Sequence, residues 1–202
     1  MDATRQRILS AAYRIFSAEG FRGAMTRRIS AEAGVNEVTV FRHFASKEQM
    51  LAAALDWHAA ISIAAIDARP LPGEPAALRA ELTSFLLGTL AGFLESHQAV
   101  RTSLGEWGHH PDLDESLMLT TNHVYDMLER YLAAARAAGL IRPDANIVVA
   151  AELMLATVFA DGMLRQVLPR RFPLDPAASV AAYLDLVLDG LAPAAVLARE
   201  DS

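Results

Sequence analysis

The 202-residue sequence contains no cysteine. Disulfide bonds, thiolate nucleophiles, cysteine-based zinc sites and thiol redox sensing are therefore excluded, because each of them needs a cysteine sulfur. Glycine and proline are few, at 11 and 9 residues, and charged residues make up 21% of the chain against 53% hydrophobic residues. This composition disfavours disordered, collagen-like and low-complexity chains, and it predicts a globular protein with a substantial core.

Long uncharged runs are also missing. The longest, from Leu82 to Leu94, has thirteen residues, whereas a membrane-spanning helix needs about 20 apolar residues. The N-terminus begins Met-Asp-Ala-Thr-Arg and lacks the apolar stretch and cleavage site of a secretory signal. We therefore expect a cytoplasmic protein with no membrane partner.

The net charge of −6 is unevenly distributed. Residues 1–50 carry eight basic and five acidic side chains, a net charge of +3, and residues 51–202 carry ten basic and nineteen acidic ones, a net charge of −9. This asymmetry indicates that the N-terminal part meets a polyanion while the remainder does not.

Alternating runs of β-branched residues are absent, and apolar residues recur instead at spacings of three and four almost throughout the chain. This periodicity predicts an all-α fold of about nine helices and no strand. The first helix is expected to end at Gly20, and the others to cover residues 27–33, 37–44, 46–66, 76–96, 97–107, 113–138, 146–168 and 176–191. Residues 68–75 hold three prolines and a glycine, which predicts a loop.

Residues at the expected helix ends favour this division. Gly20 and Gly34 suit the left-handed conformation that ends or turns a helix. Thr26, Asn36 and Ser46 have side-chain oxygens that can accept hydrogen bonds from the first backbone amides of the helices that follow. Three short helices are thus expected before the long one that begins near residue 46.

The second and third of these helices form a helix-turn-helix pattern around Gly34. Its inward-facing residues are expected to be Ile29, Ala33, Val35, Val40 and Phe44, with the small Ser30 at the helix crossing. A helix fits the major groove of B-DNA, where exposed polar side chains reach base edges and cations neutralise phosphates. The polar side chains of the second helix are Glu37, Thr39, Arg42 and His43, and the flanking cations are Arg27, Arg28 and Lys47.

The same region resembles the DNA-binding domain of TetR-family transcriptional regulators. The resemblance covers roughly the first 50 residues and rests on Thr4-Arg5-Gln6-Arg7-Ile8-Leu9, Ala12, Phe16, Gly20, Phe21, Thr26, Ile29, Ala33-Gly34-Val35, Thr39, Phe41-Arg42-His43-Phe44 and Lys47-Glu48. It implies a DNA-binding domain in residues 1–50 and a ligand-binding and dimerisation domain in residues 51–202. It also implies a homodimer that binds a double-stranded, palindromic operator, most often as a repressor released by a small molecule.

The resemblance also implies roles for single residues. Thr26 and Arg27 are similar to phosphate contacts, and Arg28 adds positive charge beside them. The groove-facing turn of the recognition helix corresponds to Asn36, Glu37, Val38 and Thr39, and further base or phosphate contacts correspond to Arg42, His43 and Lys47. Phe41 stands where the family commonly has Tyr, so a hydroxyl that would meet a phosphate is absent. Ser30 replaces the usual Ala, a change that should not disturb the helix crossing.

The larger C-terminal part is expected to hold an effector pocket and the dimer surface. Candidate pocket residues are Phe85, Phe93, Trp107, Met118, Tyr125, Met154 and Phe159, with Asn122 and His123 as polar groups that could orient an apolar or amphipathic ligand. For any one of the apolar side chains a plain core position is favoured over a pocket position, and for Asn122 and His123 an exposed surface is an equal alternative. The helix at 146–168 is apolar nearly all round and must be covered on two sides. The resemblance implies that the last two long helices of two subunits provide that cover.

One alternative concerns a polar cluster in the C-terminal part. The side chains of Glu106, His109, His110 and Asp112 could bind a metal, although their spacing matches no regular helical ligand pair. The sequence has no glycine-rich phosphate loop and no evident nucleophile–base pair, so neither an enzyme nor a cofactor is expected. The other reading is a helical protein that binds a small molecule or a metal and retains a vestigial helix-turn-helix.

Overall fold

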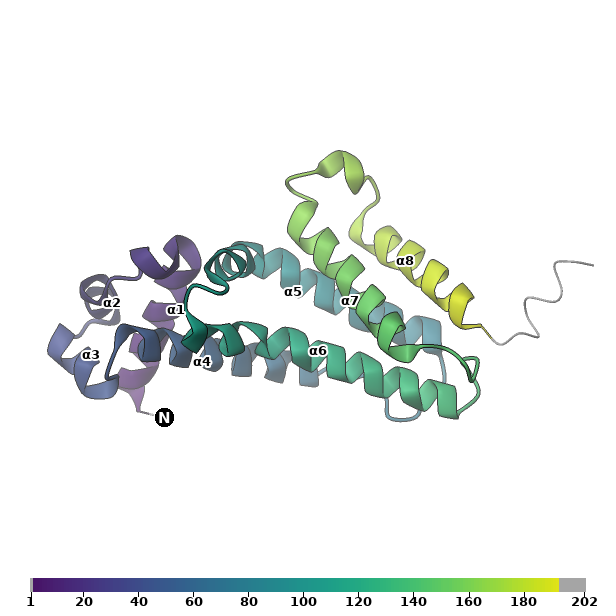
Figure 1. Cartoon of the computed structure of the whole chain (residues 1–202), viewed down its shortest axis with the longest axis horizontal. Coiled ribbons are helices and arrows are strands. Elements are labelled where there is room, and N and C mark those ends of the chain that lie inside the picture. The colour runs from purple at the N-terminus through teal and green to yellow at the C-terminus, as the bar shows by residue number, and fades with distance from the viewer. Residues whose placement is uncertain (1, 193–202) are drawn as a thin grey trace, which may run out of the picture. The chain divides into compact units, whose positions relative to one another are not determined.

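The computed structural model describes residues 2–192, apart from the side chains of residues 111, 112 and 117. Within that range the chain forms eight α-helices and one short 3-10 helix and contains no strand, which confirms the all-α prediction (Figure 1). The elements are α1 (Ala3–Gly23), α2 (Thr26–Ala33), α3 (Glu37–His43), α4 (Lys47–Asp67), α5 (Leu78–Glu106), α6 (Pro111–Ala137), α7 (Ile147–Leu164), η1 (Pro169–Arg171) and α8 (Pro176–Leu191).

The contacts divide the chain into two compact units. The first comprises Met1–Ala65 with Ser96–Thr121, and the second comprises Ile66–Glu95 with Asn122–Ser202. Each unit has its own apolar core. In the first unit, buried residues of α1 to α4 pack together with Leu113 of α6. In the second unit, buried residues of α5 to α8 do so.

The short helices of the first unit begin and end largely where the sequence predicts. Asn36 caps α3, Ser46 accepts a hydrogen bond from the Gln49 amide at the start of α4, and Gly34 ends α2 in the left-handed conformation with φ 65°. The prediction for Thr26 is wrong, because Thr26 is already the first residue of α2 and Met25 is the cap. Met25 has no side-chain oxygen, so no side-chain hydrogen bond caps this helix.

The end of α1 also differs from the prediction. Helical structure continues to Gly23, and Gly20 forms a kink with φ 70° and ψ −171°. Gly20 has the positive φ that a left-handed conformation needs, but its ψ is extended, and the chain resumes helical hydrogen bonding after it.

The two helices predicted for residues 76–96 and 97–107 are the single helix α5. Neither glycine nor proline separates them in the sequence, so nothing breaks the backbone ladder at their predicted junction. The predicted break after α7 contains the 3-10 turn η1. Helix α8 has the predicted bounds, with Asp175 as its cap.

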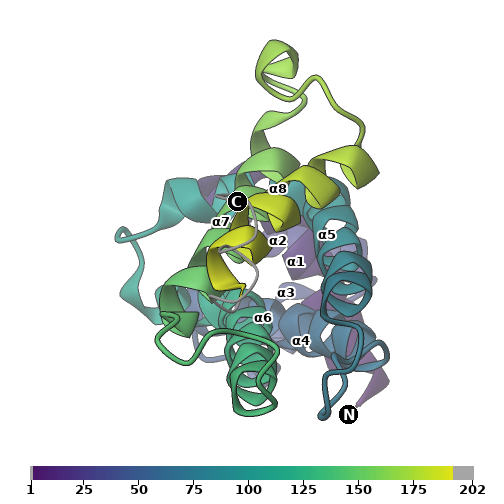
Figure 2. The same ribbon diagram turned by 90° about the vertical axis from the view of Figure 1, so that its right-hand side faces the viewer.

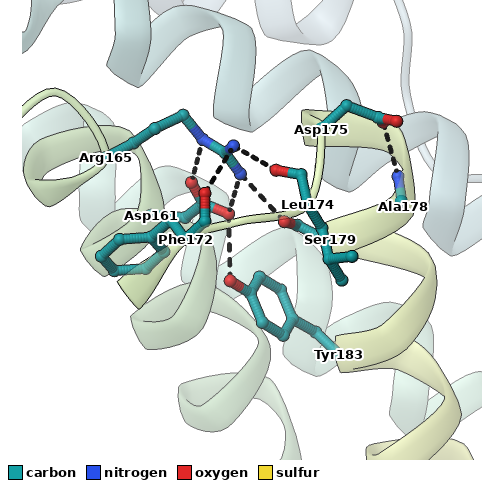
Figure 3. A network of polar contacts seen from close by, with 8 residues as sticks. All are labelled: Asp161, Arg165, Phe172, Leu174, Asp175, Ala178, Ser179 and Tyr183. Atoms are coloured by element: carbon teal, nitrogen blue, oxygen red, sulfur yellow. Dashed lines mark hydrogen bonds and ion pairs between the residues drawn. The ribbon is translucent and has the colours of Figure 1, made fainter. Parts of the chain in front are cut away.

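Helices α7 and α8 form a hairpin within the second unit and lie side by side in both views (Figures 1 and 2). A buried polar network joins them through the connecting segment (Figure 3). The Asp161 carboxylate is fully buried and accepts two hydrogen bonds from Arg165, at 2.6 and 2.8 Å, and one from the Tyr183 hydroxyl, at 3.0 Å. Arg165 also donates to the Ser179 hydroxyl and to the carbonyl of Leu174.

Two of the described helices, α4 and α7, are long and apolar enough to cross a membrane by length and composition alone. Counting uncharged runs did not find them because charged residues interrupt each helix, Asp56 in α4 and Glu152 and Asp161 in α7. Core helices of soluble proteins meet the same two criteria. In α7 the buried Asp161 and the apolar side chains around it pack into the core of the second unit.

Candidate nucleic-acid interface

The helix-turn-helix is held together by its predicted apolar residues. Ile29, Ala33, Val40 and Phe44 are buried, and Val35 is partly buried against them. The small Ser30 is buried too, and its hydroxyl donates a hydrogen bond to the Arg27 carbonyl at 2.9 Å. The inner face predicted from the sequence is confirmed, and it fixes which side chains remain outside.

The first turn of α3 is closed by hydrogen bonds within the protein. The side-chain oxygen of Asn36 accepts one from the backbone amide of Thr39 and one from the Thr39 hydroxyl, each at 2.8 Å. Asn36 is exposed and Glu37 is half-buried. Two of the polar groups predicted to face DNA are thus engaged with each other.

The outer face of α3 combines apolar and cationic side chains. Val38 is 69% exposed, Phe41 is 53% exposed and Arg42 is exposed as well. None of the three is needed to cover the core, because Val40 and Phe44 do that from the other side of the helix. This face is available for an external partner.

The cations of the motif fall into two classes. Arg27 and Arg42 are exposed, and neither forms an ion pair with any residue in the described part of the chain. Arg28 instead holds Glu19 through two contacts, which raise the pKa of the guanidinium and lower the pKa of the carboxylate. His43 lies 3.7 Å from the Asp2 carboxylate, a pair that is ionic only when the imidazole is protonated.

Lys47 does not extend freely from the start of α4. Its ammonium donates a hydrogen bond to the Phe21 carbonyl and lies 4.2 Å from the centroid of the Phe21 ring. Partial burial lowers the pKa of Lys47. Its charge is therefore directed toward the end of α1.

Phe21 also contacts two residues at and just beyond the end of α5, Glu106 and His110. The Glu106 carboxylate accepts a hydrogen bond from the Phe21 amide at 2.8 Å, and the His110 ring stacks on the Phe21 ring with centroids 3.6 Å apart. His110 and Glu106 are 3.7 Å apart. These two residues of the proposed metal cluster thus contact Phe21.

The other two residues of the possible metal cluster are His109 and Asp112. His109 is exposed, and the Asp112 side chain lies outside the described residues. Among the side chains that the structure describes, no three of His, Asp or Glu gather as a metal site would require.

The predicted pocket residues are split between the two units. Trp107 and Met118 belong to the first unit, where Trp107 is exposed and Met118 is half-buried. The remaining six aromatic, methionine and amide positions belong to the second unit. Phe85 and Met154 are in its core, Tyr125 packs against that core, the rings of Phe93 and Phe159 lie edge to face with centroids 5.2 Å apart, and Asn122 is exposed.

The polar group predicted beside Asn122 has a partner of its own. His123 Nε2 lies 2.7 Å from the Asp67 carboxylate. A surface hollow does occur in the second unit, but it is lined by residues 77–80, Thr83, Ser84 and Leu87 and includes none of the predicted pocket residues.

The network around Asp161 was not predicted from the sequence. A signal was present, since an aspartate and an arginine stand four positions apart at the end of an otherwise apolar helix. This pair could have predicted a polar site on the face of α7 that packs against α8.

Comparison with known proteins agrees with this geometry. Residues 8–54 match the family model of bacterial regulatory proteins of the tetR family. The HTH-type transcriptional repressor NicS of Pseudomonas putida is 29% identical over 158 residues, which cover 78% of this chain and 74% of NicS. The HTH-type transcriptional regulator YvkB of Bacillus subtilis is 38% identical over 58 residues, 29% of this chain and 31% of YvkB.

Two solved structures share the fold over most of its length. The triclosan complex of SmeT, a repressor from Stenotrophomonas maltophilia, has a TM-score of 0.73 at 23% identity and covers 95% of this chain and 92% of its own. Bacillus subtilis FadR in complex with stearoyl-CoA has a TM-score of 0.71 at 17% identity, with coverages of 92% and 98%. The tetR-family match over residues 8–54, the regulator relatives and the shared fold make this chain similar to the DNA-binding transcriptional regulators of the TetR family.

Proposed function

We propose that this regulator binds a palindromic operator as a homodimer and represses transcription until a small apolar or amphipathic molecule releases it. In this proposal residues 1–50 are the DNA-binding domain and residues 51–202 bind the effector and the second subunit. A regulator of this kind acts in the cytoplasm, where bacterial DNA is found.

The observation that carries the proposal is the outer face of the helix-turn-helix. Arg27 and Arg42 are exposed and lack ion pairs within the described residues, and unpaired cations can neutralise phosphates without first breaking a protein contact. The proposed contact set also includes residues in or beside the same two helices: Thr26, Arg28, Asn36, Glu37, Val38, Thr39, Phe41 and His43. Lys47 enters this set as a positioning residue, because its ammonium is bound to Phe21.

Exposed apolar side chains on α7 and α8 support a dimer. Val148, Val149 and Leu153 are exposed on α7, and Leu186 of α8 is 78% exposed. Other residues of both helices are buried in the unit's own core, so the helices are apolar on two sides. A second copy of the same hairpin would cover the exposed sides in a four-helix bundle.

The kind of effector is proposed from the relatives and from the second unit. SmeT is described with triclosan, an apolar molecule, and FadR with stearoyl-CoA, which joins an apolar acyl chain to a polar, charged coenzyme. Phe85, Phe93, Tyr125, Met154 and Phe159 could line an apolar site, and the adaptable Met side chain suits such a surface. These side chains pack on the core or on one another, so a ligand would enter by displacing them. Release of DNA requires that the ligand binds the DNA-incompetent conformation more tightly.

Selection of bound fragments from a random duplex library by the purified protein, at near-physiological salt, tests this function. The proposal predicts an enriched sequence with two-fold symmetry and half-sites about one helical turn apart or somewhat more. Weak, salt-sensitive binding with no enriched sequence would contradict it and would favour a helical ligand- or metal-binding protein with a vestigial helix-turn-helix.

A further inference from the structure

The proposed operator binding leaves open which feature of the base pairs α3 would read. Val38 and Phe41 are the most exposed apolar side chains of this helix, at 69% and 53%. They stand three positions apart and therefore lie on one side of the helix. Val40 faces the opposite way and is buried. The surface that α3 offers to a partner is consequently apolar in its middle.

The polar groups of the same helix turn are partly engaged. Asn36 accepts hydrogen bonds from both the amide and the hydroxyl of Thr39. The side-chain oxygen of Asn36 and the hydroxyl proton of Thr39 are thereby used inside the protein. The first turn of α3 then has fewer hydrogen-bonding groups for base edges than its sequence suggests.

Only one base offers an apolar group in the major groove. The base-pair edges there present hydrogen-bond donors and acceptors, and thymine alone adds a C5 methyl group. An exposed valine or phenylalanine gains free energy in a complex mainly by removing apolar surface from water. The chemistry of Val38 and Phe41 therefore matches thymine methyl groups.

We propose that Val38 and Phe41 are specificity-determining residues that read thymine C5 methyl groups in each operator half-site. This inference rests on the proposed function, since it needs an operator bound through α3. It adds the base chemistry that α3 recognises: at least one thymine per half-site is contacted through its methyl group.

Replacement of thymine by deoxyuridine tests the proposal, because uracil keeps every hydrogen-bonding group and lacks only the methyl. Each thymine of the enriched duplex is replaced in turn, and the affinity of the wild-type protein is measured by fluorescence anisotropy. We expect a loss of about fourfold at each contacted position, and about fifteenfold when both half-sites are changed, from the transfer free energy of one methyl group.

Variants then assign each methyl to a side chain. Val38→Ala should bind the thymine and uracil duplexes equally at one position, and Phe41→Ala should do so at another. Ile61→Ala, which truncates an exposed apolar side chain of α4, serves as the matched control and should keep the full uracil effect at every position.

Three results would overturn the proposal: enriched half-sites without thymine, equal wild-type affinity for every uracil duplex, or an undiminished uracil effect in both α3 variants. The wild-type scan needs no variant to fold. Failure of the library selection to enrich any duplex would instead overturn the proposed function, and this inference with it.

Discussion

Single residues of the helix-turn-helix differ in how much of their charge is free for a partner. The Arg28 guanidinium is held by Glu19 through two contacts, whereas Arg42 projects from α3 with no ion pair in the described chain. Both were indistinguishable as surface cations in the sequence. Only the pairing separates an arginine that can meet DNA directly from one that must first leave a carboxylate.

Arg42→Ala is expected to lower affinity for the selected duplex by about five- to 150-fold, which corresponds to the loss of a base contact of roughly 1–3 kcal/mol. Arg28→Ala should lower it by less than about threefold, because the Arg28 guanidinium must leave the Glu19 carboxylate before it can meet a phosphate. Anisotropy titrations of both variants at one salt concentration provide the comparison. Equal losses in the two variants would contradict this division of roles.

All four tyrosines of the chain have a raised pKa, because burial removes each phenol from water. Folding therefore favours the neutral phenols. This stabilisation is complete below the ordinary tyrosine pKa of about 10 and is lost as the pH rises through the higher folded values.

We expect the free energy of unfolding to decline above about pH 10. Urea unfolding followed by circular dichroism, together with phenolate absorbance, measures both quantities. Ionisation of all four phenols near pH 10 in the folded protein, with no loss of stability, would argue against this prediction.

At the scale of single residues, the contact that Lys47 makes could not be predicted from the sequence. Its position and charge indicated a DNA contact, but its ammonium binds Phe21, which lies 26 residues earlier. Local spacing identifies helices, caps and the inner face of a motif. It does not show which distant side chain will take up a flexible cation.

At the scale of helices, the kink in α1 depends on a glycine. Gly20 has a positive φ, and a Cβ atom there would stand 2.5 Å from a Glu106 carboxylate oxygen. Gly88, in the middle of α5, has ordinary helical geometry. A Cβ atom at Gly88 would have no neighbouring atom within 4 Å. Substitution by alanine is therefore expected to change the free energy of unfolding in opposite directions at the two glycines.

Gly20→Ala is expected to destabilise the protein by about 1–3 kcal/mol, since alanine is strained at positive φ and would push Glu106 from the Phe21 amide. Gly88→Ala should stabilise it by about 0.5–1 kcal/mol, because alanine is the better helix former. Urea denaturation reports both changes. A stabilised Gly20→Ala protein would be inconsistent with the kink.

The α7–α8 hairpin depends on a buried charge. Asp161→Asn leaves the Arg165 guanidinium without its anion in a mostly buried site, and the loss of one partner of such a pair destabilises by about 3–5 kcal/mol. Asp185→Asn, which breaks an exposed pair with Arg79, should change stability by less than about 1 kcal/mol. Similar urea midpoints for the two variants would refute the special role of Asp161.

Helix boundaries could be predicted well where residues with special backbone preferences stand at the ends, as at Gly34 and Asn36. The division of α5 into two helices was wrong because no such residue marks the supposed junction. The cap of α2 was misplaced because a favourable residue, Thr26, stands one position inside the helix.

At the scale of the whole molecule, the predicted two-domain order remains a proposal, and packing divides the chain differently. Residues 96–121 pack with the N-terminal helices, although the sequence assigns them to the C-terminal domain. Contacts such as that of Glu106 with Phe21 join residues 85 positions apart. Hydrophobic periodicity carries no information on pairings of this kind.

The dimer is tested by placing a charge on its proposed surface. Leu186→Glu should convert the protein to a monomer in sedimentation at micromolar concentration, because a carboxylate cannot be buried unpaired in the bundle. Leu104→Glu, at an exposed apolar position of α5, is the control and should remain dimeric. A dimeric Leu186→Glu protein, or a monomeric wild type, would contradict the proposed interface.

The most direct measurement of the central claim compares two duplexes of equal length and base composition, the selected one and a base-shuffled one. Fluorescence anisotropy at near-physiological salt should show at least about a thousandfold preference for the selected duplex. Equal affinity for the two duplexes would contradict sequence-specific recognition through the helix-turn-helix.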